Sequence, residues 1–302
     1  MTNEQRPKIV NVYQAVTNRI LEELRKGTIP WKQKYVSTGC RARNHESGKP
    51  YSVLNAMLVG GSGEFLTFNQ IKRLGGTLRK GCHANSIYLY KMFIPKDRKK
   101  QAEQLKKEGK DPMRLAVPIL WRYNVFNIAD VDGLKDVAKA PDPGEELTRE
   151  RMSAMGRNAA RLADVYAGSQ PTLRLAEGGE SAYDAGTDTV TVPPTALFSK
   201  ETDYAEALLK ELVHSTSHPG RCDRKAWKDN DFTSPQEELA GEIGASMLMY
   251  ELGLESETTV KESASYIARW IREMKKDDRL VVTASSQAEK AAKFILNAAT
   301  GR

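Results

Sequence analysis

The sequence predicts an α+β protein made of two domains. Its 302 residues are enough for two domains of ordinary size. The first half contains short β-rich pieces separated by Gly and Asn, whereas helical periodicity dominates the second half around a single small strand signal. The stretch KAPDPGEE, residues 139–146, has the Pro and Gly content of a linker. We therefore predict a mixed α/β domain over 1–140, a linker over 141–148 and a mostly helical domain over 149–302.

An amphipathic helix is predicted over 7–26, because apolar residues recur there at helical spacing and Gly27 follows as a stop signal. Two later segments are predicted to be strands, SIYLYKMFI at 86–94 and PILWRYNVFNI at 118–128, because they are rich in β-branched and aromatic residues. The segment between them, PKDRKKQAEQLKKEGKDP, is strongly charged. We expect it to be an exposed loop or a short helix.

The second half is predicted to open with a helix over 149–167, and the strand-like piece DTVTV follows. Further helical patterns cover 202–218, 235–252, 259–276 and 285–299. Several helices with one small sheet complete the predicted α+β architecture.

Positive charge is concentrated in the first domain. Residues 1–132 contain 24 Lys and Arg against 11 Asp and Glu, whereas the remaining residues contain 22 against 28. Clustered cations neutralise phosphates and release counterions, so this asymmetry predicts a polyanion-binding domain. The alternative is a basic surface that only keeps the protein soluble. No apolar run approaches the roughly 18 residues of a membrane span, and the N-terminus is too polar for a secretory signal, so we expect a cytoplasmic protein without membrane contact.

The segment KELVHSTSHPG, which begins at Lys210, approaches a zinc-peptidase helix in two frames. Such a helix carries HExxH, in which two histidines one turn apart bind one ion and the glutamate polarises a metal-bound water. In the first frame Lys210 replaces the first histidine, while Glu211 and His214 are retained. In the second frame, from His214 to His218, Ser215 replaces the glutamate, and a serine hydroxyl is a poor general base.

The helix predicted over 235–252 offers two carboxylates one turn apart, Glu238 and Glu242. A metal site with few histidines commonly takes a carboxylate from a second helix, and another carboxylate often steadies a ligand imidazole. Glu238 is therefore a candidate ligand and Glu242 a candidate partner of a ligand. The alternative is a solvated acidic face.

The segment LLKELVHSTSHPGRCDR, followed by EELAGEIGASM, resembles the metallopeptidase-type domain of the ArdC-like antirestriction proteins, whose pattern there is HELxHxTGHxxRL and then EELxAEhGA. The pieces SAYDAGTDTVTVPPTALF and TDYAEALL are similar to the same family. In the first half PYSVLN, FLTFNQIKRLGGTLRKG and YNVFNIADVDGL resemble its single-stranded DNA-binding domain. The resemblance extends over nearly the whole chain, and implies a zincin-like fold for the second domain.

The resemblance selects the first frame of the histidine motif. Carried over position by position, it implies that Lys210 stands at the first ligand histidine and Glu211 at the catalytic glutamate. It implies that His214 is the second ligand and Glu238 the third. His218 matches the histidine that closes the family pattern HxTGH, and is the weaker candidate ligand.

Lys210 decides whether the zinc ion that the resemblance implies is bound. A protonated lysine has no lone pair to donate and repels a divalent cation. One alternative is a zinc ion held by His214, Glu238 and His218, with the lysine neutral or displaced. The other places the lysine ammonium where the ion would be, paired with Glu238 or Glu211, which leaves the hydrolytic centre inactive.

Single-stranded DNA is bound by cationic grooves with aromatic rings on which bases stack. The first domain combines both ingredients, and its candidate DNA-binding residues are Trp31, Lys32, Lys34, Arg41, Arg43, Tyr51, Lys72, Arg73, Arg79 and Lys80. Further aromatic residues nearby are Tyr88, Tyr90, Trp121 and Tyr123. For each single ring, burial in a core is the alternative.

Three functions follow from these observations. We predict a single-stranded DNA-binding antirestriction protein of a plasmid or phage that protects incoming DNA. The alternatives are a zinc-dependent peptidase tethered to DNA, acting on a peptide substrate, and an inactive module that binds a host protein. No Walker loop, nucleotide-binding glycine motif or GxSxG motif supports nucleotide hydrolysis or serine-hydrolase chemistry.

Overall fold

The computed structural model of the chain describes residues 11–33, 36, 41–134, 158–168, 171–176, 178–254 and 260–300. Its contacts divide into two compact units. The first contains Met1–Val12 and Phe65–Lys135, and the second contains Tyr13–Glu64 and Asp136–Arg302. The predicted linker at 141–148 lies outside the described residues.

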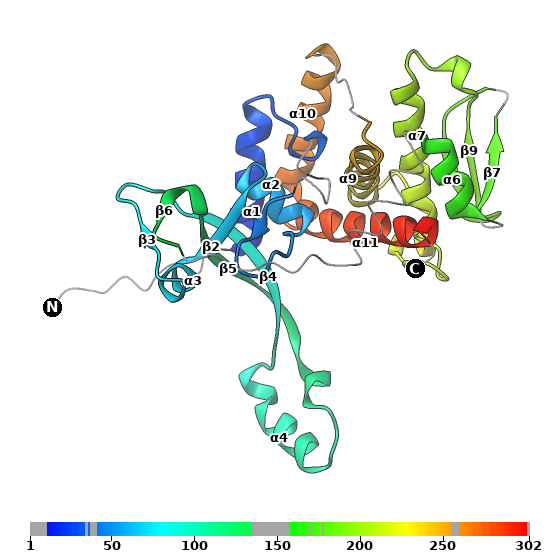
Figure 1. Cartoon of the computed structure of the whole chain (residues 1–302). Helices are drawn as coiled ribbons and strands as arrows, with labels where there is room; N and C mark the ends of the chain where they lie inside the picture. The colour runs from blue at the N-terminus through cyan, green and yellow to red at the C-terminus, as the bar shows by residue number, and fades with distance from the viewer. Residues whose placement is uncertain are drawn as a thin grey trace. The chain divides into compact units, whose positions relative to one another are not determined.

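The first unit is built on antiparallel strands in the order β2 (Glu64–Thr67), β5 (Val117–Asn127) and β4 (Asn85–Phe93). All nine residues of β4 pair with β5, so the two strands form one long hairpin (Figure 1). The two strand predictions for this part of the chain are confirmed. Their β-branched and aromatic residues suit an extended, pleated backbone.

A small core closes one end of this sheet. Helix α3 (Phe68–Arg73) begins with a capping box, in which the Thr67 hydroxyl accepts from the Gln70 N–H and the Gln70 side chain accepts from the Thr67 N–H. Ile71 of this helix packs with Leu66 and Val131.

The other end of the hairpin carries the charged segment. It folds into α4 (Lys99–Lys107), flanked by the short helices η3 (Lys96–Arg98) and η4 (Pro112–Leu115). Figure 1 shows α4 at the far end of β4 and β5. The prediction of a short helix here is confirmed, and most of its side chains are exposed.

The second unit is mostly helical and contains one small sheet. The sheet has the order β7 (Thr172–Leu175), β9 (Thr189–Val192) and β8 (Ala182–Asp184), with β7 parallel and β8 antiparallel to β9. The helices are α1 (Val12–Arg25), α2 (Val53–Val59), α6 (Ala159–Ala167), α7 (Glu201–Ser215), α8 (Lys225–Asp229), α9 (Pro235–Glu251), α10 (Val260–Lys276) and α11 (Leu280–Thr300). The α+β prediction is confirmed.

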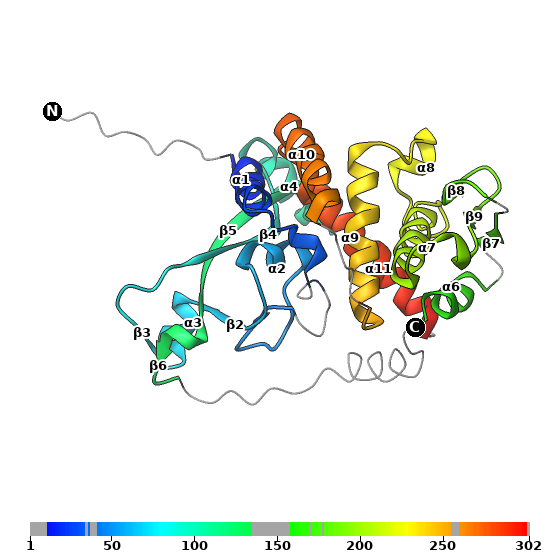
Figure 2. The ribbon, with the colours of Figure 1, turned by 90° about the horizontal axis from the view of Figure 1, so that it is seen from above.

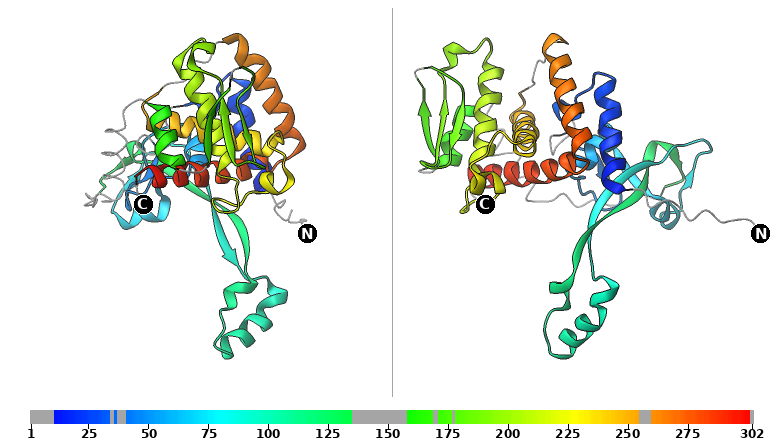
Figure 3. Two further views of the ribbon diagram at one scale, coloured as in Figure 1. Left: turned by 90° about the vertical axis from the view of Figure 1, so that its right-hand side faces the viewer. Right: turned by 180° about the vertical axis from the view of Figure 1, so that it is seen from behind.

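Helix α9 forms the centre of this unit, where it contacts α7 and α11, and Figure 2 shows it between α10 and α7. Helix α7 also packs on the sheet (Figure 3). Two glycines let α7 and α9 approach closely. A Cβ atom on Gly241 would lie 2.8 Å from Cε1 of His214, and one on Gly244 would lie 2.7 Å from a methyl of Val213. Since α9 is buried on nearly all sides, its residues show little amphipathic pattern.

Several predicted helix limits differ from the structure. The first helix, predicted over 7–26, is α1 over Val12–Arg25. The helix predicted over 202–218 ends at Ser215, because the hydroxyl of this serine and the following turn satisfy the last carbonyls and Pro219 cannot continue the ladder. The last helix begins at Leu280, before the predicted residue 285. Residues 149–157 of another predicted helix lie outside the described residues. Within the described part of the chain, no helix has the length and apolar character needed to cross a membrane.

Residues 13–64 belong to the second unit, although the sequence prediction placed them in the first domain, over 1–140. The physical reason is a set of buried contacts with the C-terminal helices. Thr17 donates a hydrogen bond to the carbonyl of Asp278 at 2.8 Å, and the Arg41 guanidinium lies 2.8 Å from Glu289 of α11. The packing units are therefore not continuous segments of the sequence.

Candidate functional site

Helices α7 and α9 place the predicted hydrolytic residues next to each other. The Lys210 ammonium lies 3.1 Å from both carboxylate oxygens of Glu238. This geometry corresponds to the alternative in which the lysine occupies the cation position. A protonated lysine offers three donors, and two of them suffice for this bidentate contact.

His214 is oriented by a buried carboxylate that the sequence interpretation missed. Its Nδ1 lies 2.9 Å from Glu237 of α9, and the side chains of both residues are only 3% exposed. Arg224 donates to both oxygens of Glu237, at 2.5 and 3.0 Å. Burial would raise the pKa of Glu237, but the bonds from His214 and Arg224 outweigh it and lower the pKa to about 2. The ionised carboxylate therefore accepts the Nδ1 proton and fixes the orientation of the ring.

Glu242, predicted to steady a ligand imidazole, lies elsewhere. It accepts a hydrogen bond from the Tyr266 hydroxyl at 2.7 Å, and its carboxylate is 3.9 Å from the Lys32 ammonium. Glu237 contacts His214 instead, because a helix turns about 100° per residue and Glu237 and Glu242 therefore face different neighbours. A signal for Glu237 was present in the sequence, since it is the first glutamate of the EEL motif.

Glu211, the predicted catalytic residue, is buried against the sheet. Burial raises the pKa of its carboxyl, and the nearby positive groups of His214 and Lys210 oppose this effect only in part. Such a carboxyl suits proton transfer chemically. Its predicted catalytic role depends on a metal-bound water, and remains a prediction.

His218 does not join the group. It lies beyond the end of α7, its Nδ1 accepts the N–H of Gly220 at 3.1 Å, and its ring packs 5.5 Å from that of Trp227. Throughout the described residues, no three His, Cys, Asp or Glu side chains come together in a way that could hold a metal ion. The donor set around Lys210 therefore does not fit the zinc site that the HExxH frame implies.

Five described DNA-binding candidates belong to the second unit, and three of them are enclosed by partners within it. Trp31 is 0% exposed, and its indole N–H donates to the Tyr266 hydroxyl at 2.9 Å. Lys32 forms an ion pair with Glu206, and burial lowers the pKa of its ammonium. Arg41 is buried too, and donates to the carbonyl of Val36. These positions correct the prediction that the three residues bind DNA, because side chains enclosed in this way are not accessible to a base or a phosphate.

The remaining predicted DNA-binding residues divide by exposure. Tyr51 is buried, which raises its pKa to about 12, and Arg43 is half-buried. Lys34 lies outside the described residues. The first unit exposes four candidates, Lys72, Arg73, Arg79 and Lys80. They lie close to α3 and to the paired strands β3 (Thr77–Leu78) and β6 (Val131–Asp132). The guanidinium of Arg79 lies 2.9 Å from the Asp132 carboxylate.

The hairpin of β4 and β5 exposes two aromatic rings, one on each of its faces, for which burial in a core was the alternative. Tyr90 is 50% and Trp121 47% exposed, whereas Tyr88 is buried. The Lys91 ammonium lies over Trp121 and Tyr123, 5.4 and 5.1 Å from the ring centres. This part of the hairpin combines accessible rings with positive charge.

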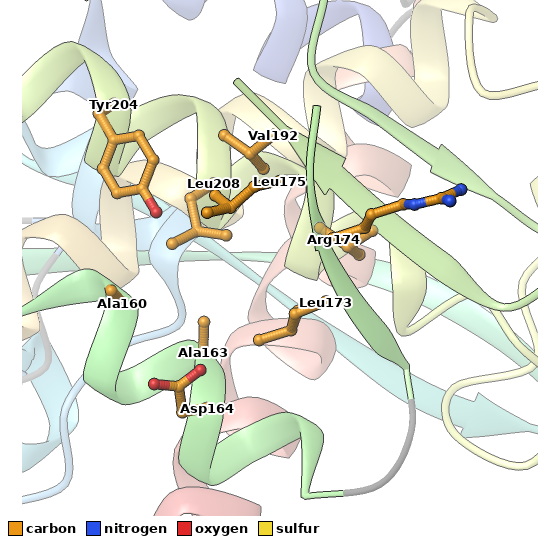
Figure 4. A pocket seen from close by; sticks show the side chains of 10 residues that line it. Ala160, Ala163, Asp164, Leu173, Arg174, Leu175, Val192, Tyr204 and Leu208 are labelled. Carbon is orange, nitrogen blue, oxygen red and sulfur yellow. The ribbon is translucent and has the colours of Figure 1, made fainter. Parts of the chain in front are cut away.

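A separate cavity of about 250 Å³ lies between α6, α7 and the sheet (Figure 4). Its lining is mainly aliphatic, and includes Leu173, Val192 and Leu208. Tyr204 and Asp164 provide polar groups at its edge. None of the residues predicted as a site lines this cavity.

Comparisons with known proteins agree with this architecture. The model of the N-terminal domain of anti-restriction factor ArdC matches residues 10–126, and the model of a zincin-like metallopeptidase matches residues 161–287. DNA primase TraC of Escherichia coli is 28% identical over 306 residues, which cover 94% of this chain and 27% of TraC. The chain thus spans about a quarter of the length of this curated relative.

Two crystal structures of the antirestriction protein ArdC from the R388 plasmid are similar to this chain. Both are 26% identical, and the match covers 96% of this chain and 98% of theirs. The TM-score is 0.64 for the metal-free structure and 0.65 for the Mn(II)-bound one. A metal ion is thus a known ligand of that relative. Two matched domain models and a full-length structural match together show that this chain belongs to the ArdC-like antirestriction proteins, with a zincin-like second domain.

Proposed function

We propose that this ArdC-like protein binds single-stranded DNA through the hairpin of β4 and β5, and that it protects DNA entering the cytoplasm of a cell on a plasmid or phage. The observation that carries the proposal is the exposed ring of Trp121 beside the Lys91 ammonium, with Tyr123 on the same face of the hairpin. Antirestriction function is named for the R388 relative. The hairpin supplies a physical means by which this chain could contact DNA.

The rings suit unpaired bases better than a duplex. A base stacked on an aromatic side chain contributes about 1 to 3 kcal/mol, and it must expose its flat face to do so. In a duplex that face is covered by the neighbouring base pairs. Trp121 exposes about half of its surface, and Tyr123, two residues along the same strand, lies on the same face of the hairpin. The hairpin therefore favours a single strand.

The far end of the hairpin adds the charge that a phosphate backbone requires. Residues 96–114 contain eight Lys and Arg against four Asp and Glu. Within this segment Lys106 and Lys107 end helix α4, so their charges also suit the helix dipole. A strand stacked on the rings would follow the hairpin toward these cations. Affinity should therefore fall steeply as salt rises.

Fluorescence anisotropy with a labelled oligothymidylate tests the proposal. Alanine at Trp121 or Tyr123 should weaken binding by about 1 to 3 kcal/mol, or roughly five- to 150-fold in Kd. The matched control is Leu197→Ala, which removes a 63% exposed apolar side chain from the second unit. A duplex of equal length should bind more weakly than the single strand. Unchanged affinity in both aromatic variants would refute the hairpin as the binding surface.

A further inference from the structure

Six charged side chains of the second unit, Lys210 among them, lie close together and form what we call the ionic cluster. Its three carboxylates and three cations are Glu206, Glu238, Glu242, Lys32, Lys210 and Arg269. They come from α7, α9, α10 and the short helix η1 (Pro30–Lys32), so distant parts of the sequence supply them. When all six groups are ionised, the ionic cluster is neutral as it stands.

Glu238, which matches the third ligand of the family motif, is fully engaged by cations. Both of its oxygens lie 3.1 Å from the Lys210 ammonium, and Arg269 lies 3.4 Å from one of them. Neither cation has a lone pair for a metal ion. A metal bound by this carboxylate would lie next to a positive charge. It would also lack the ligand that the first histidine of HExxH provides, because Lys210 stands at that position.

Lys32 is held in place by a buried framework rather than by chance contact at the surface. Its side chain is 9% exposed, it pairs with Glu206, and its main-chain carbonyl accepts from the Tyr250 hydroxyl at 2.6 Å. The Tyr266 hydroxyl joins the two sides of this framework. It accepts from Trp31 at 2.9 Å and donates to Glu242 at 2.7 Å. The position of the Lys32 charge is thus fixed by the fold.

We infer that the ammonium groups of Lys210 and Lys32 supply the two positive charges that a divalent cation would bring to this centre. The second unit then folds without a metal, and the ionic cluster takes up neither Mn²⁺ nor Zn²⁺. This distinguishes the chain from the R388 ArdC protein, of which a Mn(II)-bound structure exists. The inference is independent of DNA binding, which involves other residues.

Thermal unfolding and titration calorimetry of the full chain test the inference. EDTA, or a small excess of MnCl₂ or ZnCl₂, should change the Tm of the wild-type protein by no more than about 1 °C, and calorimetry should detect no stoichiometric binding. A metal that saturates a native site would raise the Tm by about 5 °C or more. Stoichiometric binding to wild type, with a Tm that falls in EDTA, would overturn the inference.

Variants at the two lysines give a second, independent readout. Lys210→Met should lower the Tm by several degrees without metal, because Glu238 loses its main partner, whereas Lys210→Arg should keep most of it. The matched control is Lys293→Met, which removes a 64% exposed lysine that pairs with Glu289. Lys210→His combined with Lys32→Met removes both charges and adds an imidazole.

The double variant should gain a rise in Tm with Zn²⁺ or Mn²⁺ that EDTA reverses. If it gains none, the lysine charges are not what excludes the metal, and the inference fails. It also fails if Lys210→Met has the same Tm as Lys293→Met, because the ammonium would then not stabilise the centre.

Discussion

Arg224 offers the sharpest test of how the site is held together. Its guanidinium donates to both oxygens of Glu237, to the Thr216 hydroxyl and to the carbonyl of Val213, and all these groups are buried. The variant Arg224→Met keeps much of the side-chain volume and removes every one of these bonds. Glu237 then remains as a buried carboxylate with His214 as its partner.

The size of the loss follows from burial. Removing one partner of a buried ion pair typically costs about 3 to 5 kcal/mol, because the remaining charge is left without compensation. His214 and Arg224 together outweigh burial and lower the pKa of Glu237 from its ordinary value of 4.5 to about 2, which corresponds to about 3 kcal/mol of stabilisation at neutral pH that the two residues share. Because the pKa is lowered on folding, this contribution is present above pH 4.5 and is lost as the pH falls toward 2. We therefore expect Arg224→Met to lose about 3 to 5 kcal/mol at pH 7.

Urea denaturation followed by circular dichroism measures this loss. The matched control is Lys228→Met, a few residues along the chain, where an ammonium pairs with Asp223 at the surface and both side chains are more than half exposed. This control should lose less than about 1 kcal/mol. A second replacement, Glu237→Leu, should restore part of the stability lost in Arg224→Met. The reasoning is refuted if Arg224→Met costs no more than the control.

Three further predictions concern other contacts. Asp188 pairs with Arg221, and its pKa lies below its ordinary value because the bonds from Arg221 and Tyr183 outweigh the opposing effect of burial. The stabilisation by Asp188 is therefore present above about pH 4 and lost at lower pH. In urea titrations the difference in stability between wild type and Asp188→Asn should shrink as the pH falls from 5 to 2, and a constant difference would contradict this. Gly241→Ala should cost about 1 to 3 kcal/mol, because its Cβ would lie 2.8 Å from the His214 ring, whereas Gly61→Ala, with nothing within 4 Å, should change the free energy of unfolding by less than about 0.5 kcal/mol. Lys91→Gln should reduce the slope of log Kd against log salt by about 0.7 for single-stranded DNA, and an unchanged slope would remove this lysine from the proposed surface.

The sequence predicted most of the helices and the hairpin, because their local patterns agree with their tertiary surroundings. The strands at 86–94 and 118–128 are rich in residues that favour extended backbone. The family motif places Lys210 and Glu238 on two successive predicted helices. Their contact at 3.1 Å was one of the two alternatives for the site. Periodicity within a segment is enough for such predictions.

The surroundings of the site could not be predicted in the same way, because they depend on packing between distant segments. Trp31 and Lys32 have the composition of a DNA-binding surface, but they are buried against α9 and α10. Glu237 and Glu238 are adjacent in the sequence, and only the orientation of α9 decides which of them contacts His214. The exposure of Trp121 follows from the hairpin extending beyond the core, which no residue pattern specifies.

Ultraviolet cross-linking of the full chain to an oligothymidylate, followed by mass spectrometry of the peptides, tests the central claim most directly. Nucleotide adducts should map to the hairpin of β4 and β5, at Trp121 or Tyr123, and should diminish as salt rises. Adducts confined to peptides of the second unit, with none on the hairpin, would contradict the account.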